Sequence, residues 1–494
     1  MFGTHAHGNT TRFILRSGLR MLSCVRRILR ACLAGVVTVA AVGPLHCQAQ
    51  PVDLLIINAR VIDVVTGRIA TARTIAIHGD TIVSIGPTRR RAQGPSVRVV
   101  GAGGRYLLPG LWDMHVHFGG GAALIAENRA LLPLYTAHGV VAVRDAAGDL
   151  SESVLAWRDS IARGLMDGPT VFTSGPKLEG LNSIWPGDIE IDTRAGVDSA
   201  LNALQAMHVD FVKLTDNTLK PELFRYALGE IRKRGLQSSA HIPAAVPVRD
   251  AVELGLGSIE HLGYAVRAGA ERAGQPTPAD VIAAFDSATA MATYRLMAAR
   301  GTAITPTLNI SRTLAWLDSD SHVTDPFLRY IGPGLQATYQ GRVTRAAQAD
   351  SAAIARRHRT YQFTSACLPM LQRAGVLILA GTDAGFLNSF DYPGIGLHDE
   401  LRLMVQAGLT PLEALRGATI NGATFLGKAK RHGTIAVGKA ADLVMLDHNP
   451  LLDIRATREI HAVVQRGHYL DRGALDDLLN ATAALVARMP KPAP

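Results

Sequence analysis

The sequence predicts an α/β fold in which an eight-stranded parallel β/α barrel carries a small β-sandwich domain built from both chain ends. Both ends alternate short β-branched runs with Gly, Asn and Asp turns, as antiparallel strands do. The middle alternates short apolar strands with helical segments, which favours a parallel sheet. The 494 residues suit one barrel of about 250 residues or more plus a smaller module.

The order of these patterns divides the chain into five segments. They are residues 1–49 (leader), 50–107 (first part of the sandwich), 108–426 (barrel), 427–470 (second part of the sandwich) and 471–494 (C-terminal helical tail). Within the barrel segment, Val197, Leu201 and Leu204 share one helix face. Thr410 and Glu413, with a proline between them, predict a capped helix start.

The leader combines positive charge with an apolar run. Residues 1–49 hold six arginines and no acidic residue. Residues 31–45 form an apolar run whose length is typical of a secretory signal. The run is shorter than the ~20 residues that span a bilayer. We expect export to the bacterial periplasm or beyond, with cleavage after Ala49. An uncleaved membrane anchor and a lipid anchor at Cys47 are the alternatives.

Removing the leader changes both the charge and the cysteine content. Of 51 Lys and Arg residues, 45 remain against 41 Asp and Glu, so the formal charge of +10 gives no reason to expect a nucleic-acid partner. Only Cys367 remains of the four cysteines, so an intramolecular disulfide is excluded. We expect no stable membrane insertion after signal removal.

Polar residues at the ends of successive strands predict the active face. In a barrel all the carboxyl ends of the strands converge on one mouth, whereas an open doubly wound sheet is the competing arrangement. The residues at or near these ends are His117, Asp145, Lys213, His241, His261 and Asp383.

A metal site is predicted at this mouth. His115 and His117 are two apart on one strand, so both imidazoles point to the same side and can grip one ion, although a core pair is the alternative. Lys213 lies among apolar residues and is expensive to bury as a cation. Carbon dioxide can convert its amine into a carbamate that bridges two ions, whereas a lysine reaching solvent is the plain alternative. Asp383 ends an apolar run and needs a metal or a donor.

The sequence at this point resembles the amidohydrolase superfamily of metal-dependent hydrolases, through "PGLWDMHVH" at 109–117, "GTDAG" at 381–385 and "GTIAVGKAADLVMLD" at 433–447. It is most similar to the imidazolonepropionase- and prolidase-related group. The resemblance implies a TIM-type barrel and two divalent ions, most simply zinc. It implies that His115, His117 and Asp383 hold one ion, that His241 and His261 hold the other, and that carbamylated Lys213 bridges them.

The resemblance implies hydrolysis of a carbon–nitrogen bond, in an amide or cyclic amide, by a metal-bridging hydroxide, with Asp383 as the proton carrier. Dipeptidase-like cleavage of dipeptides or N-acyl amino acids is the runner-up, and a non-catalytic binding protein on the same fold is a second alternative. A serine hydrolase is discounted because the chain has no Gly-x-Ser-x-Gly.

Substrate contacts are predicted from residues that follow strand ends. They are Arg144, Lys177, Tyr264 and Asn309. The positive charges of Arg144 and Lys177 suggest a substrate carboxylate. Arg144 and Asp145 can instead pair with each other. Trp185 either walls the pocket or anchors its loop. The long segment 310–374 is expected to form a helical lid or a surface for homo-oligomer formation.

Overall fold

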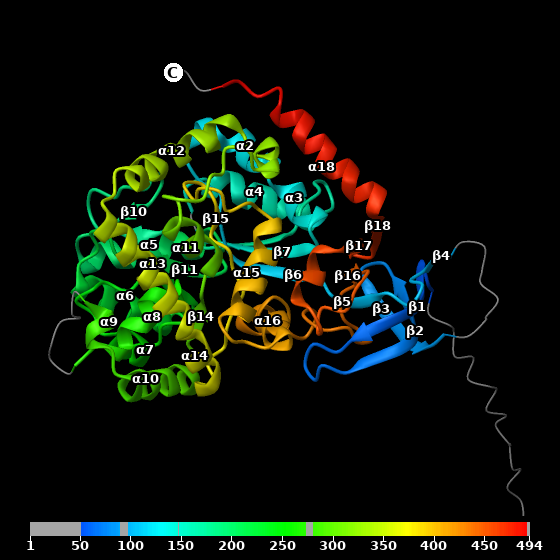
Figure 1. The fold of residues 1–494 in the computed structure, drawn as a ribbon, viewed down its shortest axis with the longest axis horizontal. Coiled ribbons are helices and arrows are strands. Elements are labelled where there is room, and N and C mark those ends of the chain that lie inside the picture. Colours follow the sequence, from blue (N-terminus) through cyan, green and yellow to red (C-terminus); the bar gives the residue numbers. More distant parts are fainter. Residues whose placement is uncertain (1–50, 89–96, 147, 273–279, 492–494) are drawn as a thin grey trace, which may run out of the picture. The chain divides into compact units, whose positions relative to one another are not determined.

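The structure, a computed structural model, describes residues 51–88, 97–146, 148–272 and 280–491. The predicted leader lies outside the described residues. The strands form three sheets and the helices cover the two parallel ones (Figure 1). The strands of the first sheet are β1 (Leu54–Ile62), β2 (Ile69–His78), β3 (Thr81–Pro87), β4 (Arg98–Gly101), β5 (Tyr106–Pro109), β16 (Leu443–Leu446), β17 (Ile460–Gln465) and β18 (His468–Asp471).

This first sheet joins the two ends of the described chain. Its strand order is β18-β17-β16-β5-β1-β2-β3, with β4 on β1, and β5 pairs antiparallel with β16 so that Leu108 opposes Val444. A core that includes Ile56, Ile75 and Leu443 covers one of its faces. The expected sandwich is not confirmed, because all eight strands are hydrogen-bonded in one sheet. Alternating apolar residues mark a half-buried strand but do not say which sheet it joins.

Two parallel sheets make up the middle of the chain. Their orders are β15-β6-β7-β8 and β10-β9-β11-β12-β13-β14. The strands are β6 (Leu111–His117), β7 (Val140–Asp145), β8 (Thr170–Thr173), β9 (Leu178–Glu179), β10 (Ile189–Glu190), β11 (Val212–Leu214), β12 (Ser238–Ala240), β13 (Ser258–Glu260), β14 (Ala303–Thr305) and β15 (Ala384–Gly385). The α/β class is therefore confirmed, whereas no closed barrel is formed by the strands that the structure describes.

Backbone hydrogen bonds nevertheless connect the two parallel sheets. The amide of Asp210 donates to the carbonyl of Thr173 (2.9 Å), and that of Ile304 donates to Leu377 (3.0 Å). The amide of Met114 donates to Ala380 (2.9 Å). The apolar run predicted as the eighth strand is buried. Among the described residues it forms the Ile304–Ile378 bridge and single backbone hydrogen bonds, and the two-residue strand β15 that follows it pairs with β6.

Helices follow most of the parallel strands. They are α2 (Ile125–Ala130), α3 (Leu132–Ala137), α4 (Ser151–Ala162), α5 (Arg194–Ala206), α6 (Pro221–Lys233), α7 (Val248–Glu253), α8 (Leu262–Val266), α9 (Val281–Ala284), α10 (Ser287–Arg300), α11 (Leu308–Ala315), α12 (Pro333–Ala347), α13 (Ser351–Ala366), α14 (Leu368–Ala374), α15 (Ile395–Gln406), α16 (Pro411–Gly417), α17 (Ile420–Phe425) and α18 (Arg472–Val486). The predicted capping box of α16 is confirmed, since Thr410 Oγ1 accepts from the amide of Glu413 while the Glu413 carboxylate accepts from the amide of Thr410. The predicted buried face of α5 is confirmed as well.

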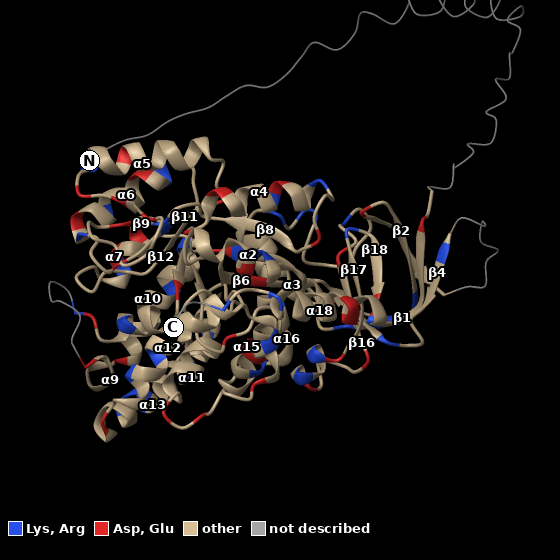
Figure 2. Ribbon diagram, turned by 90° about the horizontal axis from the view of Figure 1, so that it is seen from above, with Lys and Arg blue, Asp and Glu red and all other residues tan. Residues whose placement is uncertain are grey.

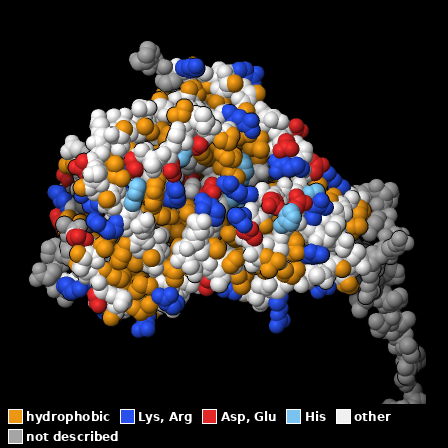
Figure 3. Space-filling view, in the orientation of Figure 1, with side chains coloured by type: hydrophobic (Ala, Val, Ile, Leu, Met, Phe, Trp, Pro, Cys, Tyr) orange, Lys and Arg blue, Asp and Glu red, His pale blue; other side chains and the backbone are white. Residues whose placement is uncertain are grey.

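The segment 310–374 is helical, as expected, and α13 packs on α8 and α11 (Figure 1). Cys367 is buried and is a free thiol. Lys and Arg as well as Asp and Glu are scattered along the ribbon (Figure 2) and over the face drawn in Figure 3, as the near balance of charges predicts. Among the residues described, none of the helices has the length and apolar character needed to cross a membrane.

Candidate metal centre

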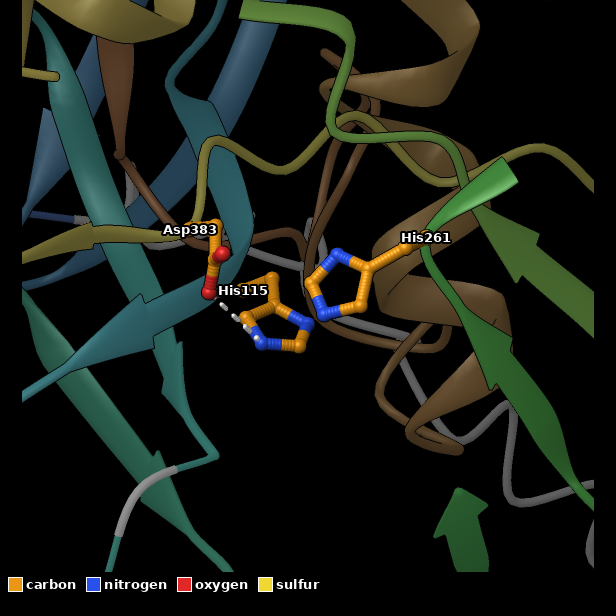
Figure 4. A group of neighbouring side chains, drawn as sticks. All are labelled: His115, His261 and Asp383. Atoms are coloured by element: carbon orange, nitrogen blue, oxygen red, sulfur yellow. Dashed lines mark ion pairs between the residues drawn. The ribbon is translucent and has the colours of Figure 1, made fainter. Parts of the chain in front are cut away.

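His115, His117 and Asp383 come together where β6 meets β15. Asp383 Oδ1 lies 2.7 Å from His117 Nε2 and 3.2 Å from His115 Nε2, and the two Nε2 atoms are 3.2 Å apart. The side chains of His115 and Asp383 point toward each other in Figure 4. The two-residue spacing on one strand thus delivers both imidazoles to the same carboxylate.

The second pair of histidines lies opposite, at the ends of β12 and β13. His241 Nε2 and His261 Nε2 are 3.0 Å apart, and the His115 and His261 rings are 5.1 Å apart. One ligand atom from each of His115, His261 and Asp383 fits within 4.8 Å of the others. Figure 4 shows these three side chains converging on one space. The structure therefore brings all four predicted histidines and Asp383 into one cluster.

Strained backbone accompanies this cluster. His261 and Asp383 adopt φ of +66° and +75°, a region that non-glycine residues rarely occupy. Such conformations cost on the order of 1–3 kcal/mol each and persist where the surrounding structure enforces them. Two of the candidate ligands are thus held at the cost of local stability, which is typical of functional positions.

The protonation of these side chains suits metal binding. Burial lowers the pKa of His261 to about 3 and puts that of His241 well below its usual value, so both imidazoles are neutral with lone pairs available. Burial alone would raise the pKa of Asp383, but its contacts with His117 and His115 outweigh it and hold the carboxylate ionised. The Nε2 atoms of His241 and His261 are 3.0 Å apart, so one metal ion can bind both lone pairs.

Lys213 completes the cluster from β11. Its side chain is 1% exposed, and in the part of the chain that the structure describes its Nζ has no hydrogen-bond partner. Burial lowers the pKa of Lys213 to about 8, and its charge helps to depress the pKa of His241. A buried amine without a partner is costly, so the orphaned Nζ fits an additional group at this position.

Glu260 is a residue that sequence reasoning missed. It is fully buried on β13, and its Oε2 lies 2.6 Å from His115 Nδ1. Its Oε1 accepts from Arg144 Nη2 at 2.7 Å and from two serine hydroxyls. Carboxylates that accept from a ligating histidine fix its ring and its tautomer. The available signal was the glutamate directly before His261 in a strand of three buried residues.

Arg144 is not brought to the mouth. It is fully buried, pairs with Glu260, and donates from Nε to the carbonyl of Met114 at 2.6 Å. The alternative pair with Asp145 is also absent from the ion pairs of the described residues. The physical reason is that the inward-facing Glu260 supplies a stronger, fully desolvated partner.

The other three predicted substrate residues, like Arg144, contact other side chains of the protein. Lys177 is 2% exposed and lies 2.7 Å from Asp149, 3.0 Å from Asp188 and 5.3 Å from the Trp185 ring. Trp185 also packs edge-on against Phe386, which supports its role as an anchor of the loop.

Tyr264 and Asn309 are likewise engaged within the protein. The Tyr264 hydroxyl donates to Asp216 (2.9 Å), and its ring stacks on His241 with centroids 5.2 Å apart. Asn309 donates from Nδ2 to Asp391 at 2.7 Å. Tyr264 therefore orients a candidate ligand.

The comparisons with known proteins agree with this geometry. A model of the amidohydrolase family matches residues 191–470, and the chain belongs to that family. This confirms the resemblance derived from the motifs, and the family and its solved relatives imply a TIM-barrel-like α/β fold.

Three relatives show how far the likeness extends. Ochratoxinase of Aspergillus niger is 24% identical over 426 residues, 74% of this chain and 76% of that protein. Adenine deaminase of Mesorhizobium japonicum is 42% identical over only 85 residues, 17% of this chain, so the chain spans 14% of that relative's length. The structure of a putative prolidase from Bifidobacterium longum has a TM-score of 0.65 at 23% identity and covers 87% of this chain and 100% of its own.

Proposed function

We propose that the protein hydrolyses a carbon–nitrogen bond, in an amide or a cyclic amide, with two divalent metal ions held at the cluster. The observation that carries the proposal is the buried Nζ of Lys213, which has no hydrogen-bond partner among the described residues and which interacts electrostatically with His241, His261 and Asp383. A pKa of about 8 leaves part of the amine neutral near pH 7, so that Nζ can attack carbon dioxide and release a proton. The resulting carbamate replaces a cation with an anion suited to metal ions.

The ligand assignment follows the two halves of the cluster. His115, His117 and Asp383 would hold one ion, His241 and His261 the other, and carbamylated Lys213 would lie between them. Zinc suits these nitrogen and oxygen donors, as do manganese and iron. When bound, such ions polarise a carbonyl and lower the pKa of a water molecule toward neutrality.

The chain's own groups would carry the proton and fix the geometry. The ionised Asp383 carboxylate can accept the proton of the attacking water and then deliver it to the leaving nitrogen. Glu260 holds the His115 ring through Nδ1, and Thr307 Oγ1, 2.7 Å from His261 Nδ1, does the same for His261. Both contacts leave the Nε2 atoms directed at the site.

The alternatives concern the substrate and the chemistry. Dipeptidase-like cleavage of dipeptides or N-acyl amino acids is supported by the fold shared with a prolidase. A non-catalytic binding protein remains the second alternative, since a fold does not guarantee an activity.

Other expectations accompany this proposal. We propose that the two parallel sheets function as one barrel, supported by the bond between Ile304 and Leu377, and that the sheet of the chain ends is the small domain. We also propose that residues 1–49 are a signal for export to the periplasm and that segment 310–374 forms a homo-oligomer surface. The proposed domain boundaries lie at residues 107, 426 and 470.

The first test is the metal content of the purified protein by mass spectrometry. About two ions per chain are expected, falling to one or none in Lys213→Ala, whereas Lys233→Ala, which removes an exposed lysine, should leave the content unchanged. One ion or none, unchanged by Lys213→Ala, would contradict the bridging role. Two ions with no hydrolysis across a panel of amides, cyclic amides and dipeptides would favour the binding protein.

A further inference from the structure

Helices α12 and α13 carry an excess of positive charge beside the site. Residues 333–366 hold five arginines and one acidic residue, Asp350. The Asp350 carboxylate accepts from the amide of Ala353 (2.7 Å) and so caps α13. Arg357 pairs with Asp318 at 3.1 Å, an aspartate outside the two helices. The other four arginines of the two helices form no ion pair with the residues that the structure describes.

Arg342 of α12 differs from the exposed arginines. It is half-buried, and within the described ranges it has neither an ion pair nor a hydrogen bond. Together with Arg345 and Arg357 it lines a cavity of about 390 Å³. Burial lowers the pKa of Arg342 and the negative charge of Asp383 opposes this shift, so the guanidinium experiences the field of a candidate metal ligand.

A second cavity reaches His261 of the candidate metal centre and shares lining residues with the arginine-lined cavity. It has a volume of about 530 Å³ and is mainly apolar, and its lining includes His261, Tyr264 and Tyr361 together with Arg267, Arg356 and Arg357. Leu314 and Arg357 line both cavities, so the two adjoin. A molecule whose bond lies at His261 could extend through apolar surroundings to the guanidinium of Arg342.

We propose that the substrate is an anionic amide, with an apolar group in the larger cavity and a carboxylate bound by Arg342. This inference rests on the proposed function and deepens it. The cations first expected to bind a substrate carboxylate, Arg144 and Lys177, are paired with buried carboxylates inside the protein. The planar guanidinium of Arg342 offers paired donors that match a carboxylate.

Equilibrium binding of two simple probes tests the proposal without requiring hydrolysis. We would titrate the metal-loaded protein with 4-phenylbutyrate and with 4-phenylbutan-1-ol, which share the apolar part and differ in the anion. The acid is expected to bind about 10-fold or more tightly than the alcohol, as one charge-assisted contact provides. Arg342→Met should abolish that difference and Arg342→Lys should retain part of it.

The control variant is Arg359→Met, which removes an exposed arginine of α13 that lines neither cavity. It should leave both affinities unchanged, and thermal unfolding should show that every variant is folded; if Arg342→Met is not, Arg342→Gln replaces it. An acid that binds no tighter than the alcohol, or whose affinity survives the loss of Arg342, would overturn the inference. Arg342-dependent binding without cleavage of any amide would count against the proposed function alone.

Discussion

Substitution of Glu260 by Gln tests how the metal centre is supported. The carboxylate is fully buried and accepts from four side chains, His115 at 2.6 Å, Arg144 at 2.7 Å, Ser239 at 2.7 Å and Ser258 at 2.5 Å. The glutamine amide keeps the shape of the side chain but removes its negative charge. The buried guanidinium of Arg144 is then left without a partner of opposite charge. Breaking a buried ion pair in this way costs about 3–5 kcal/mol of unfolding free energy. The loss of the His115 contact should weaken metal binding about 10–100-fold.

Two assays separate these effects. Urea unfolding of chelator-treated protein measures the loss of stability, and titration of the refilled protein measures metal affinity. Arg144→Met is the matched variant for a double-mutant cycle. In the double variant no unpaired guanidinium remains, so its loss of unfolding free energy should be smaller than the sum of the losses in the two single variants. A cost for Glu260→Gln below about 1 kcal/mol together with unchanged metal affinity would refute this account.

Two further predictions concern pH and backbone geometry. Burial raises the pKa of Glu400 from 4.5 to about 8, so its contribution to stability is full below pH 4.5 and is lost as the pH rises through about 8. Between pH 5 and pH 9, urea unfolding of the wild type should show the unfolding free energy fall by up to a few kcal/mol, and that of Glu400→Gln should fall less. Equal pH profiles for the two proteins would contradict the role of Glu400. Gly148 has φ of +78°, and a Cβ there would lie 2.0 Å from the carbonyl of Gly175, so Gly148→Ala should cost more than about 3 kcal/mol. Gly104→Ala, at φ +83° with nothing within 4 Å, should cost only about 1–2 kcal/mol, and equal melting temperatures for the two variants would contradict the clash.

The candidate ligands could be predicted because strand geometry converts sequence spacing into direction. His115 and His117 face one side of β6, and the ends of β12 and β13 bring His241 and His261 to the same place. Pairing partners could not be predicted in this way. The partner of Arg144 is Glu260, a residue 116 positions away, and local sequence contains no information on such a contact.

The same limit applies to the sheets and to the cationic helices. Alternating patterns predicted strands at both chain ends, but whether they form one sheet or two depends on long-range register. The segment 310–374 was expected to form a helical lid or an oligomer surface because it is a long segment between two predicted strands. Only the packing of α12 and α13 shows that Arg342 borders the arginine-lined cavity while Arg359 does not.

The pairing of β5 with β16 has a consequence for the biogenesis of the protein. β5 leads into β6, which carries His115 and His117. One neighbour of β5 in the first sheet, β1, precedes it, but the other, β16, is made only after the whole region of the candidate metal centre has been synthesised. Pairings so distant along the chain are slow to form and leave strand edges exposed meanwhile. We therefore expect the edge of β5 that faces β16 to stay unpaired until the last strands have been synthesised.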